Sequence, residues 1–232
     1  MIEGTRVDKR VELAQDECFS LLHRYDIDTD NVNKVKTLKE ALDFGKKHKY
    51  PIEYFCLKNK KGQIAGSREE MKDIYDNHFE DNKVTKDHKF SDHLVKKIYK
   101  NKKNFIIIIK KDTYYEYLDK GFSLPDLKKL SFGYMFEMKV ENGNKDDIIK
   151  AILPFSRNRI EREILETKFV EKCGYKSGKN YDKFKEELIT LIRKIVRIPQ
   201  DFPHIQSLSV NCIVDKGFPV IVNTRVKLDL IM

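Results

Sequence analysis

The sequence has few of the features that mark secreted, membrane-spanning or redox proteins. Its four cysteines lie far apart, which excludes the usual local zinc patterns and any redox pair with two intervening residues. We expect them to be buried small hydrophobic residues; they are Cys18, Cys56, Cys173 and Cys212. The first ten residues carry charged side chains and no apolar run. This predicts neither a signal peptide nor a membrane span, and therefore a cytoplasmic protein.

The chain does have enough apolar residues for a packed interior. Of its 232 residues, 40% are hydrophobic and 11% aromatic, which predicts one large domain or two lobes. The formal net charge of +9 at pH 7 is compatible with binding to nucleic acid, nucleotides or coenzyme A. Lysine pairs, however, occur along the whole chain, so general lysine enrichment explains the charge without a nucleic-acid partner.

The first half of the chain predicts helices separated by a strand. Apolar residues at helical spacing predict a helix over residues 13–25. Thr37 and Glu40 have the spacing of a capping box, which predicts a second helix to about His48. Residues 52–57 are rich in β-forming side chains and predict a strand.

The following stretch predicts a border between two lobes. Ser67 and Glu70 form a second capping box, which predicts a third helix. Residues 81–92 are polar and lack periodicity, so we expect a junction and a hinge there. The expected lobes are a smaller one of about residues 26–92 and a larger one of about residues 93–232 together with the N-terminal helix.

The second half of the chain is expected to build a larger sheet. Residues 105–109 are almost entirely isoleucine, which predicts a strand in the centre of a sheet with both faces covered. Two more strands are predicted over residues 134–140 and 148–153, and Ser156 is placed to cap a helix. The pattern as a whole indicates mixed α and β structure.

The C-terminal part predicts a long helix followed by a β-hairpin. Apolar residues from 184 to 195 lie on one helical face, and we expect Pro199 and Pro203 to end that helix. Residues 208–214 and 220–226 alternate as strands around a turn with a glycine.

A family resemblance begins in this C-terminal part. The run Asp201-Phe202-Pro203-His204-Ile205 and the following Leu208-Ser209-Val210-Asn211 resemble Asp-Phe-Pro-Glu-Ile and Glu-Leu-Asp-Ile-Asn-Pro of ADP-forming acyl-CoA synthetases. Further stretches agree in order and spacing: Tyr25-Asp26-Ile27, Tyr50-Pro51 before Leu57-Lys58, Leu153-Pro154-Phe155-Ser156, and Lys168 to Gly178. The chain is thus similar to the β-subunit of these enzymes over nearly its whole length.

The resemblance implies an ATP-grasp fold of the α/β (mixed α+β) class. In such a fold two lobes, each a β-sheet flanked by helices, hold ATP between them. It also implies an α-subunit as partner, which forms an acyl-phosphate and a phosphohistidine, while the ATP-grasp subunit passes the phosphate to ADP with Mg²⁺. Cations and oriented donors around the polyphosphate serve such chemistry.

Several positions of the implied nucleotide site depart from the family pattern. Lys58 stands where the phosphate-binding lysine is expected, and it is otherwise an ordinary lysine at a strand end. The family's following histidine, which carries phosphate, is missing. Lys97 falls in the adenine hinge in place of an acidic or polar residue, and Gly133 is what remains of a glycine-rich phosphate loop. Glu137 either replaces that loop's glutamate or is an outward-facing strand residue.

The implied Mg²⁺ ligands are also altered. Asn211 is retained, but Ser209 and Asn223 stand where the family has aspartates, so two negative charges are lost. Because Mg²⁺ prefers carboxylate oxygens, such a site holds Mg-ATP less firmly.

Three hypotheses for function follow. The first is a degenerate ATP-grasp subunit that binds a nucleotide or a partner without turnover, with ATP or ADP as ligand or with no cofactor. The second is an active acid-CoA ligase (ADP-forming) subunit. The third is a basic nucleic-acid-binding module that uses Tyr99 and Phe105, although the implied fold provides no stacking platform for bases.

Overall fold

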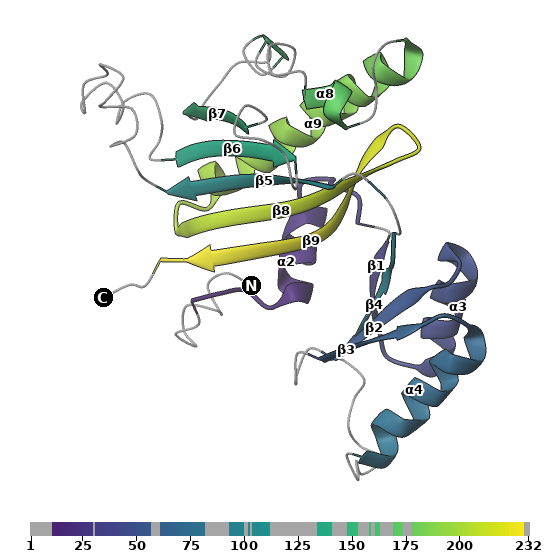
Figure 1. The fold of residues 1–232 in the computed structure, drawn as a ribbon. Coiled ribbons are helices and arrows are strands. Elements are labelled where there is room, and N and C mark those ends of the chain that lie inside the picture. The colour runs from purple at the N-terminus through teal and green to yellow at the C-terminus, as the bar shows by residue number, and fades with distance from the viewer. Residues whose placement is uncertain are drawn as a thin grey trace. The chain divides into compact units, whose positions relative to one another are not determined.

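The chain forms two compact units, each built on one antiparallel sheet. The computed structural model describes residues 11–29, 31–56, 61–81, 93–99, 102, 104–111, 134–140, 148–152, 158, 161–162, 169–173 and 178–229. The smaller unit is Thr29–Asn101, and the larger unit combines Met1–Asp28 with Lys102–Met232 (Figure 1). The predicted fold class, mixed α and β with two sheets flanked by helices, is therefore confirmed.

The smaller unit has a four-stranded sheet in the order β1-β4-β2-β3. Its strands are β1 (Val32–Val35), β2 (Ile52–Cys56), β3 (Lys61–Ala65) and β4 (His93–Lys97). Two helices accompany them, α3 (Leu38–His48) and α4 (Arg68–Asp81). Strand β4 pairs with both β1 and β2, so it belongs to this unit rather than to the larger one.

Both predicted capping boxes are present in this unit. The hydroxyl of Thr37 accepts a hydrogen bond from the backbone N–H of Glu40 at 3.2 Å, and the Glu40 carboxylate accepts one from the residue before the cap at 2.6 Å. Ser67 and Glu70 repeat the arrangement at 3.1 and 2.7 Å. Each box satisfies N–H groups that have no partner inside the helix, so the local sequence alone determines where α3 and α4 begin.

One face of the small sheet packs against α3 and α4. Its core includes Phe44 and Met71 from the helices and Ile52, Tyr54 and Val95 from the strands, all almost fully buried. The alternation of a strand places the intervening residues on the opposite face.

The larger unit has a five-stranded sheet in the order β7-β6-β5-β8-β9. Its strands are β5 (Asn104–Lys111), β6 (Tyr134–Val140), β7 (Ile148–Ile152), β8 (Ile205–Asp215) and β9 (Phe218–Leu228). The helices of this unit are α2 (Gln15–His23), α8 (Phe169–Lys172) and α9 (Lys179–Asp201). The predicted first helix, the two middle strands and the hairpin are all confirmed.

Strand β5 occupies the centre of this sheet, as predicted, but its two faces differ. Phe105, Ile107 and Ile109 are at most 1% exposed, whereas Ile106 and Ile108 are only half-buried. Among the described residues only the face with Phe105, Ile107 and Ile109 packs against a helix, so the expectation that both faces are covered stays a prediction for the other face. A run of isoleucines does not distinguish a strand with two covered faces from one with a single covered face.

The long helix α9 covers the buried face of the sheet. The Phe105 ring contacts Phe184 of α9 edge-on, with centroids 6.4 Å apart. The predicted stop at Pro199 is wrong, because this proline lies inside the helix, which continues to Asp201. Ile198 and Pro199 are both buried, so packing of the apolar face outweighs the one helical hydrogen bond that proline removes.

The hairpin and the burial of the cysteines agree with the predictions made from the sequence. Lys216 and Gly217 join β8 to β9 with φ angles of 50° and 83°, the sign that a tight hairpin turn requires. All four cysteines are buried, as expected, and none forms a disulfide with a described residue. The predicted junction beyond residue 81 and the helix expected at Ser156 lie outside the described residues. None of the described helices is both long and apolar enough to cross a membrane.

Candidate functional site

The face of the large sheet opposite α9 is rich in polar side chains. We call it the polar face; its side chains alternate with those that pack against α9, and it carries Glu137, Lys139, Ser207, Ser209, Asn211, Asn223 and Arg225. These positions come from β6, β8 and β9, which lie on either side of β5.

Strand register places the predicted site residues in two adjacent rows. In the first row, Glu137 of β6 and Ser209 of β8 both pair with Ile108 of the central strand, and Ser209 pairs in turn with Arg225. Neighbouring strands lie about 4.8 Å apart, so the backbones of Glu137 and Ser209 are separated by about 10 Å.

The second row carries the two asparagines. Asn211 of β8 pairs with Ile106 on one side and with Asn223 of β9 on the other. A β-bulge follows this pair, since Cys212 opposes Ile221. The structure thus brings Glu137 and the three candidate metal positions onto one surface, although β6 lies far before the β8–β9 hairpin in the sequence.

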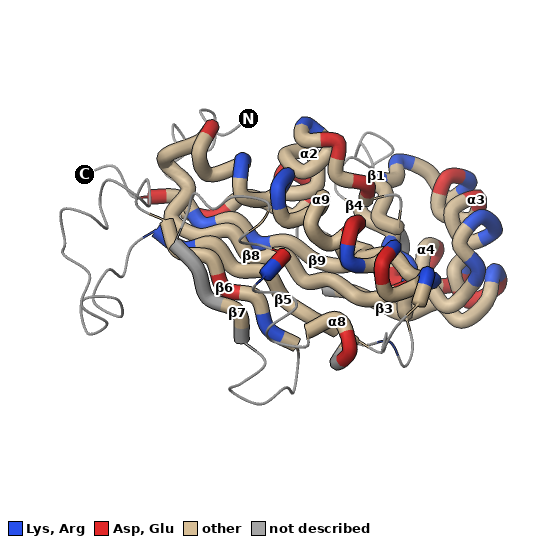
Figure 2. The backbone as a smooth tube through the Cα atoms, turned by 90° about the horizontal axis from the view of Figure 1, so that it is seen from above, with Lys and Arg blue, Asp and Glu red and all other residues tan. Residues whose placement is uncertain are grey.

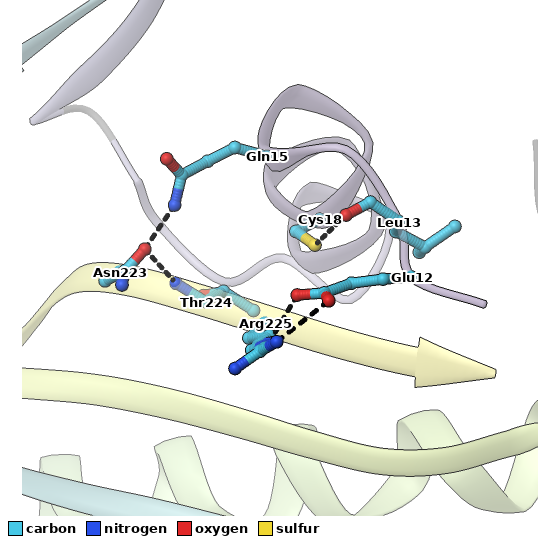
Figure 3. A network of polar contacts seen from close by, with 7 residues as sticks. All are labelled: Glu12, Leu13, Gln15, Cys18, Asn223, Thr224 and Arg225. Carbon is cyan, nitrogen blue, oxygen red and sulfur yellow. Dashed lines mark hydrogen bonds and ion pairs between the residues drawn. The ribbon is translucent and has the colours of Figure 1, made fainter. Parts of the chain in front are cut away.

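Asn223 is engaged in holding the N-terminal segment. Its Oδ1 accepts hydrogen bonds from Gln15 Nε2 and, at 3.0 Å, from the backbone N–H of Thr224 (Figure 3). An amide oxygen has two lone pairs, and both are used here. The side chain therefore joins the start of α2 to β9 and leaves no oxygen for a metal ion.

Arg225 is likewise directed toward the N-terminal segment. Its guanidinium forms a two-pronged ion pair with Glu12, in which Nη2 and Oε2 are 2.9 Å apart (Figure 3). Hydrogen bonding to Glu12 raises the pKa of Arg225. Backbone hydrogen bonds beside this pair also join the N-terminal segment to β9. The N–H of Leu13 donates to the carbonyl of Val226 at 3.0 Å, and the N–H of Leu228 donates to the carbonyl of Val11 at 2.8 Å.

Asn211 has a different environment. Its Oδ1 is buried and has no hydrogen-bond partner among the residues that the structure describes. Buried oxygens are rarely left without a donor, so this atom lacks the partner that such an oxygen usually has. Glu137, in the neighbouring row, keeps its carboxylate 3.7 Å from the ammonium of Lys139 on the same strand.

These donors do not fit a resident Mg²⁺ ion. Mg²⁺ requires near-octahedral oxygen ligands and is usually held by one or two carboxylates together with phosphate oxygens. Glu137 is the only carboxylate of the described polar face, its partner is a lysine, and the oxygen of Asn223 is already used. No three acidic, histidine or cysteine side chains within the described ranges gather closely enough to bind a metal.

In the smaller unit the structure distinguishes two neighbouring lysines. Lys97, the residue predicted to contact the nucleotide, lies in the row of Ile52 on the helical side, with its ammonium 4.6 Å from the Tyr99 ring centroid. Lys96 lies on the opposite face across from Glu53, and its ammonium is 4.8 Å from the centroid of Phe55.

Sequence reasoning missed Lys96, which is 9% exposed. Burial lowers the pKa of its ammonium, and Glu53 acts in the opposite direction. Counting alternate positions along residues 93–97 could have identified it, had that stretch been recognised as a strand. Lys97 belongs to the smaller unit, whereas Lys58 and Gly133 lie outside the described residues.

The chain is similar to known proteins in three-dimensional structure, whereas comparison of its sequence finds no match. No protein-family model and no curated protein matches the chain. A protein of Pyrococcus horikoshii Ot3 known from its crystal structure is 18% identical, with a TM-score of 0.68 over 98% of this chain and 96% of that one.

Structures of dinucleotide-forming acetyl-coenzyme A synthetase 1 from Ca. Korarchaeum cryptofilum are similarly close. The complex with coenzyme A, acetyl-coenzyme A and a phosphorylated phosphohistidine segment is 17% identical, with a TM-score of 0.69 and 98% of both chains covered. The complex with coenzyme A and Mg-AMPPCP is 16% identical, with a TM-score of 0.66 and the same coverage. Identities this low establish the fold alone, and that fold is ATP-grasp, as the sequence resemblance predicts.

Proposed function

We propose that this chain is an ATP-grasp protein of the acyl-CoA synthetase type that binds a nucleotide or a partner subunit without Mg²⁺-dependent phosphotransfer. In this proposal it is a pseudoenzyme. The observation that supports it is the pair of hydrogen bonds that Asn223 accepts, because they use the oxygen that a ligand of Mg²⁺ would need.

The charge of the polar face supports the same conclusion. A neutral hydroxyl at Ser209 and a neutral amide at Asn223 cannot offset the charge of a divalent cation, and the carboxylate of Glu137 lies beside Lys139. A nucleotide that binds here would therefore do so through direct protein contacts. On this face Glu137 is our candidate for such a contact, and Asn211 has one buried acceptor oxygen without a partner among the described residues. Lys58, Lys97 and Gly133 remain candidates on the family resemblance alone.

A partner is part of the proposal. The similar synthetase of Ca. Korarchaeum cryptofilum was solved with a phosphohistidine segment pointing towards its nucleotide-binding site. By analogy, an α-like acyl-CoA synthetase subunit is the partner we propose for this chain. A chain that has lost turnover can still be retained for such an assembly.

The alternative is an active subunit of an ADP-forming acid-CoA ligase. The observation in its favour is that the buried oxygen of Asn211 has no hydrogen-bond partner among the described residues, since a retained ligand position would leave its oxygen without a protein donor. This alternative requires that the chain, reconstituted with an α-subunit, forms ATP from ADP, phosphate and an acyl-CoA.

Calorimetric titration with ATP and ADP, each with and without Mg²⁺, distinguishes the proposed pseudoenzyme from an active ligase subunit. The proposal predicts that Mg²⁺ does not strengthen binding to the natural chain, and that Lys58→Ala weakens whatever binding exists. Restoring both carboxylates with Ser209→Asp and Asn223→Asp should introduce Mg²⁺ dependence, because the two positions lie in adjacent rows of one face.

The matched control is Ser207→Asp, which adds a carboxylate to the same strand and the same face but next to Lys110 and Lys227. It should leave the response to Mg²⁺ unchanged. Binding by the natural chain that requires Mg²⁺ would contradict the proposal and favour the active enzyme. No heat with either nucleotide would leave only the partner-binding form of the proposal.

A further inference from the structure

A basic cavity lies in the helical layer of the larger unit, where the end of α2 meets the C-terminal half of α9. Its volume is about 630 Å³, within the range of about 300–1,000 Å³ that is usual for small-molecule sites. Figure 2 shows the two helices next to each other. The lining residues include four cations, Arg24, Arg193, Lys194 and Arg197, and two acids, Asp26 and Asp201.

Hydrogen bonds between α9 and the two residues Tyr25 and Asp26, which follow α2, hold the walls of this cavity together. The ammonium of Lys194 donates to the backbone carbonyl of Asp26 at 2.5 Å, and the hydroxyl of Tyr25 donates to the Asp201 carboxylate at 2.8 Å. Burial, followed by the bond to Asp201, raises the pKa of Tyr25, so its hydroxyl keeps the proton that it donates. Asp26 has a φ of 53°, which turns the chain sharply after α2.

The cavity has more positive than negative charge. Asp201 already accepts from Tyr25 and lies 3.7 Å from the guanidinium of Arg197, so one acid serves two donors. Arg24 and Arg193 also line the cavity, and the guanidinium of neither has a hydrogen bond or an ion pair to any described residue. Two guanidinium groups are therefore available to an incoming anion.

The arrangement of these groups suits a phosphate. Thr190, Arg193, Lys194 and Arg197 are spaced by three or four residues, so they share one face of α9 and converge on the cavity. Arginine binds phosphate oxygens in pairs through its planar fork, and the threonine hydroxyl adds a further donor. The rings of Tyr25 and Phe202 add flat apolar surface beside the cations.

We propose that this cavity binds the phosphate or diphosphate group of a small metabolite, at a site separate from the polar face. The large sheet stands between the two, because α9, which supplies most of the cavity lining, covers the face of the sheet opposite the polar one. The cations hold the phosphate, and Tyr25 and Phe202 contact the rest of the molecule.

The test is calorimetric titration of the whole chain with pyrophosphate and with ADP, both without Mg²⁺ and at low ionic strength. Arg24→Gln combined with Arg193→Gln should weaken binding roughly tenfold or more, since each removed contact is a charged hydrogen bond. The matched control removes two exposed lysines elsewhere, Lys46→Gln and Lys179→Gln, and should change affinity less than threefold, as expected for screened charges.

Two further measurements locate the site and distinguish ligands. In the natural chain, pyrophosphate should slow amide exchange at residues 24–27 and 190–202 more than in the strands of the polar face. ADP that binds more tightly than pyrophosphate indicates a nucleotide, whereas equal affinities indicate that phosphate alone is recognised.

Three results would overturn the proposal: no binding of either anion, equal weakening by the control pair, or binding of single-stranded RNA without binding of pyrophosphate. If no nucleotide binds to the polar face, the proposal for the cavity is not affected. The variants of Ser209 and Asn223 alter the other side of the sheet and should not change the binding of pyrophosphate to the cavity.

Discussion

Replacing Asn223 with alanine tests whether this side chain holds the N-terminal helix. The substitution removes the hydrogen bonds from Gln15 Nε2 and from the Thr224 backbone N–H. A hydrogen bond of this kind contributes about 0.5–1.5 kcal/mol net, so the two together stabilise the junction by about 1–3 kcal/mol. Asn223→Asp keeps an oxygen at the same position and should retain most of this stability.

Amide hydrogen exchange in α2 is the appropriate assay. The chain has two compact units, and a single midpoint from denaturant is not well defined for a protein of more than one unit. Protection of the α2 amides reports the opening of this helix, and Asn223→Ala should lower it roughly 5- to 150-fold if α2 opens locally. A double-mutant cycle with Gln15→Ala isolates the bond between the two side chains and should show coupling of about 0.5–1.5 kcal/mol.

The matched control is Asn211→Ala, which removes an asparagine from the same row of the polar face. Asn211 Oδ1 has no partner among the described residues, so α2 should keep its protection. Equal losses in Asn211→Ala and Asn223→Ala, or no loss in the latter, would refute the assignment of Asn223 to a structural role. The argument against a metal site at this position would then fail with it.

Two other predictions concern local stability and titration. Ser67→Ala removes the hydroxyl that accepts from the Glu70 N–H and should destabilise the start of α4 by about 1 kcal/mol, measured as faster exchange in its first turn, whereas Ser67→Asp should not. Burial raises the pKa of the Cys18 thiol from 9.0 to about 12, so this thiol should react with a thiol reagent only after unfolding. Because the unfolded thiol ionises first, stability present below pH 9.0 should be lost progressively as the pH rises toward 12, and a Cys18→Ala variant should lose less over this interval.

Local structure could largely be predicted from the sequence, because it depends on neighbours along the chain. The capping boxes at Thr37 and Ser67, the buried face of α9 and the turn at Gly217 each involve residues only a few positions apart. The stop expected at Pro199 was wrong because helix α9 gains more from burying that residue than it loses in hydrogen bonding.

The sequence alone predicted an altered metal site, because Ser209 and Asn223 stand where the family resemblance implies aspartates. Tertiary structure decided what those residues do instead. Only the pairing of β8 with β9 and the seating of α2 place Gln15 against Asn223, across more than two hundred positions of chain. The basic cavity has the same origin, because Arg24 and Arg193 converge only when two distant helices pack together. Such contacts depend on packing between elements, which no local spacing of residues encodes.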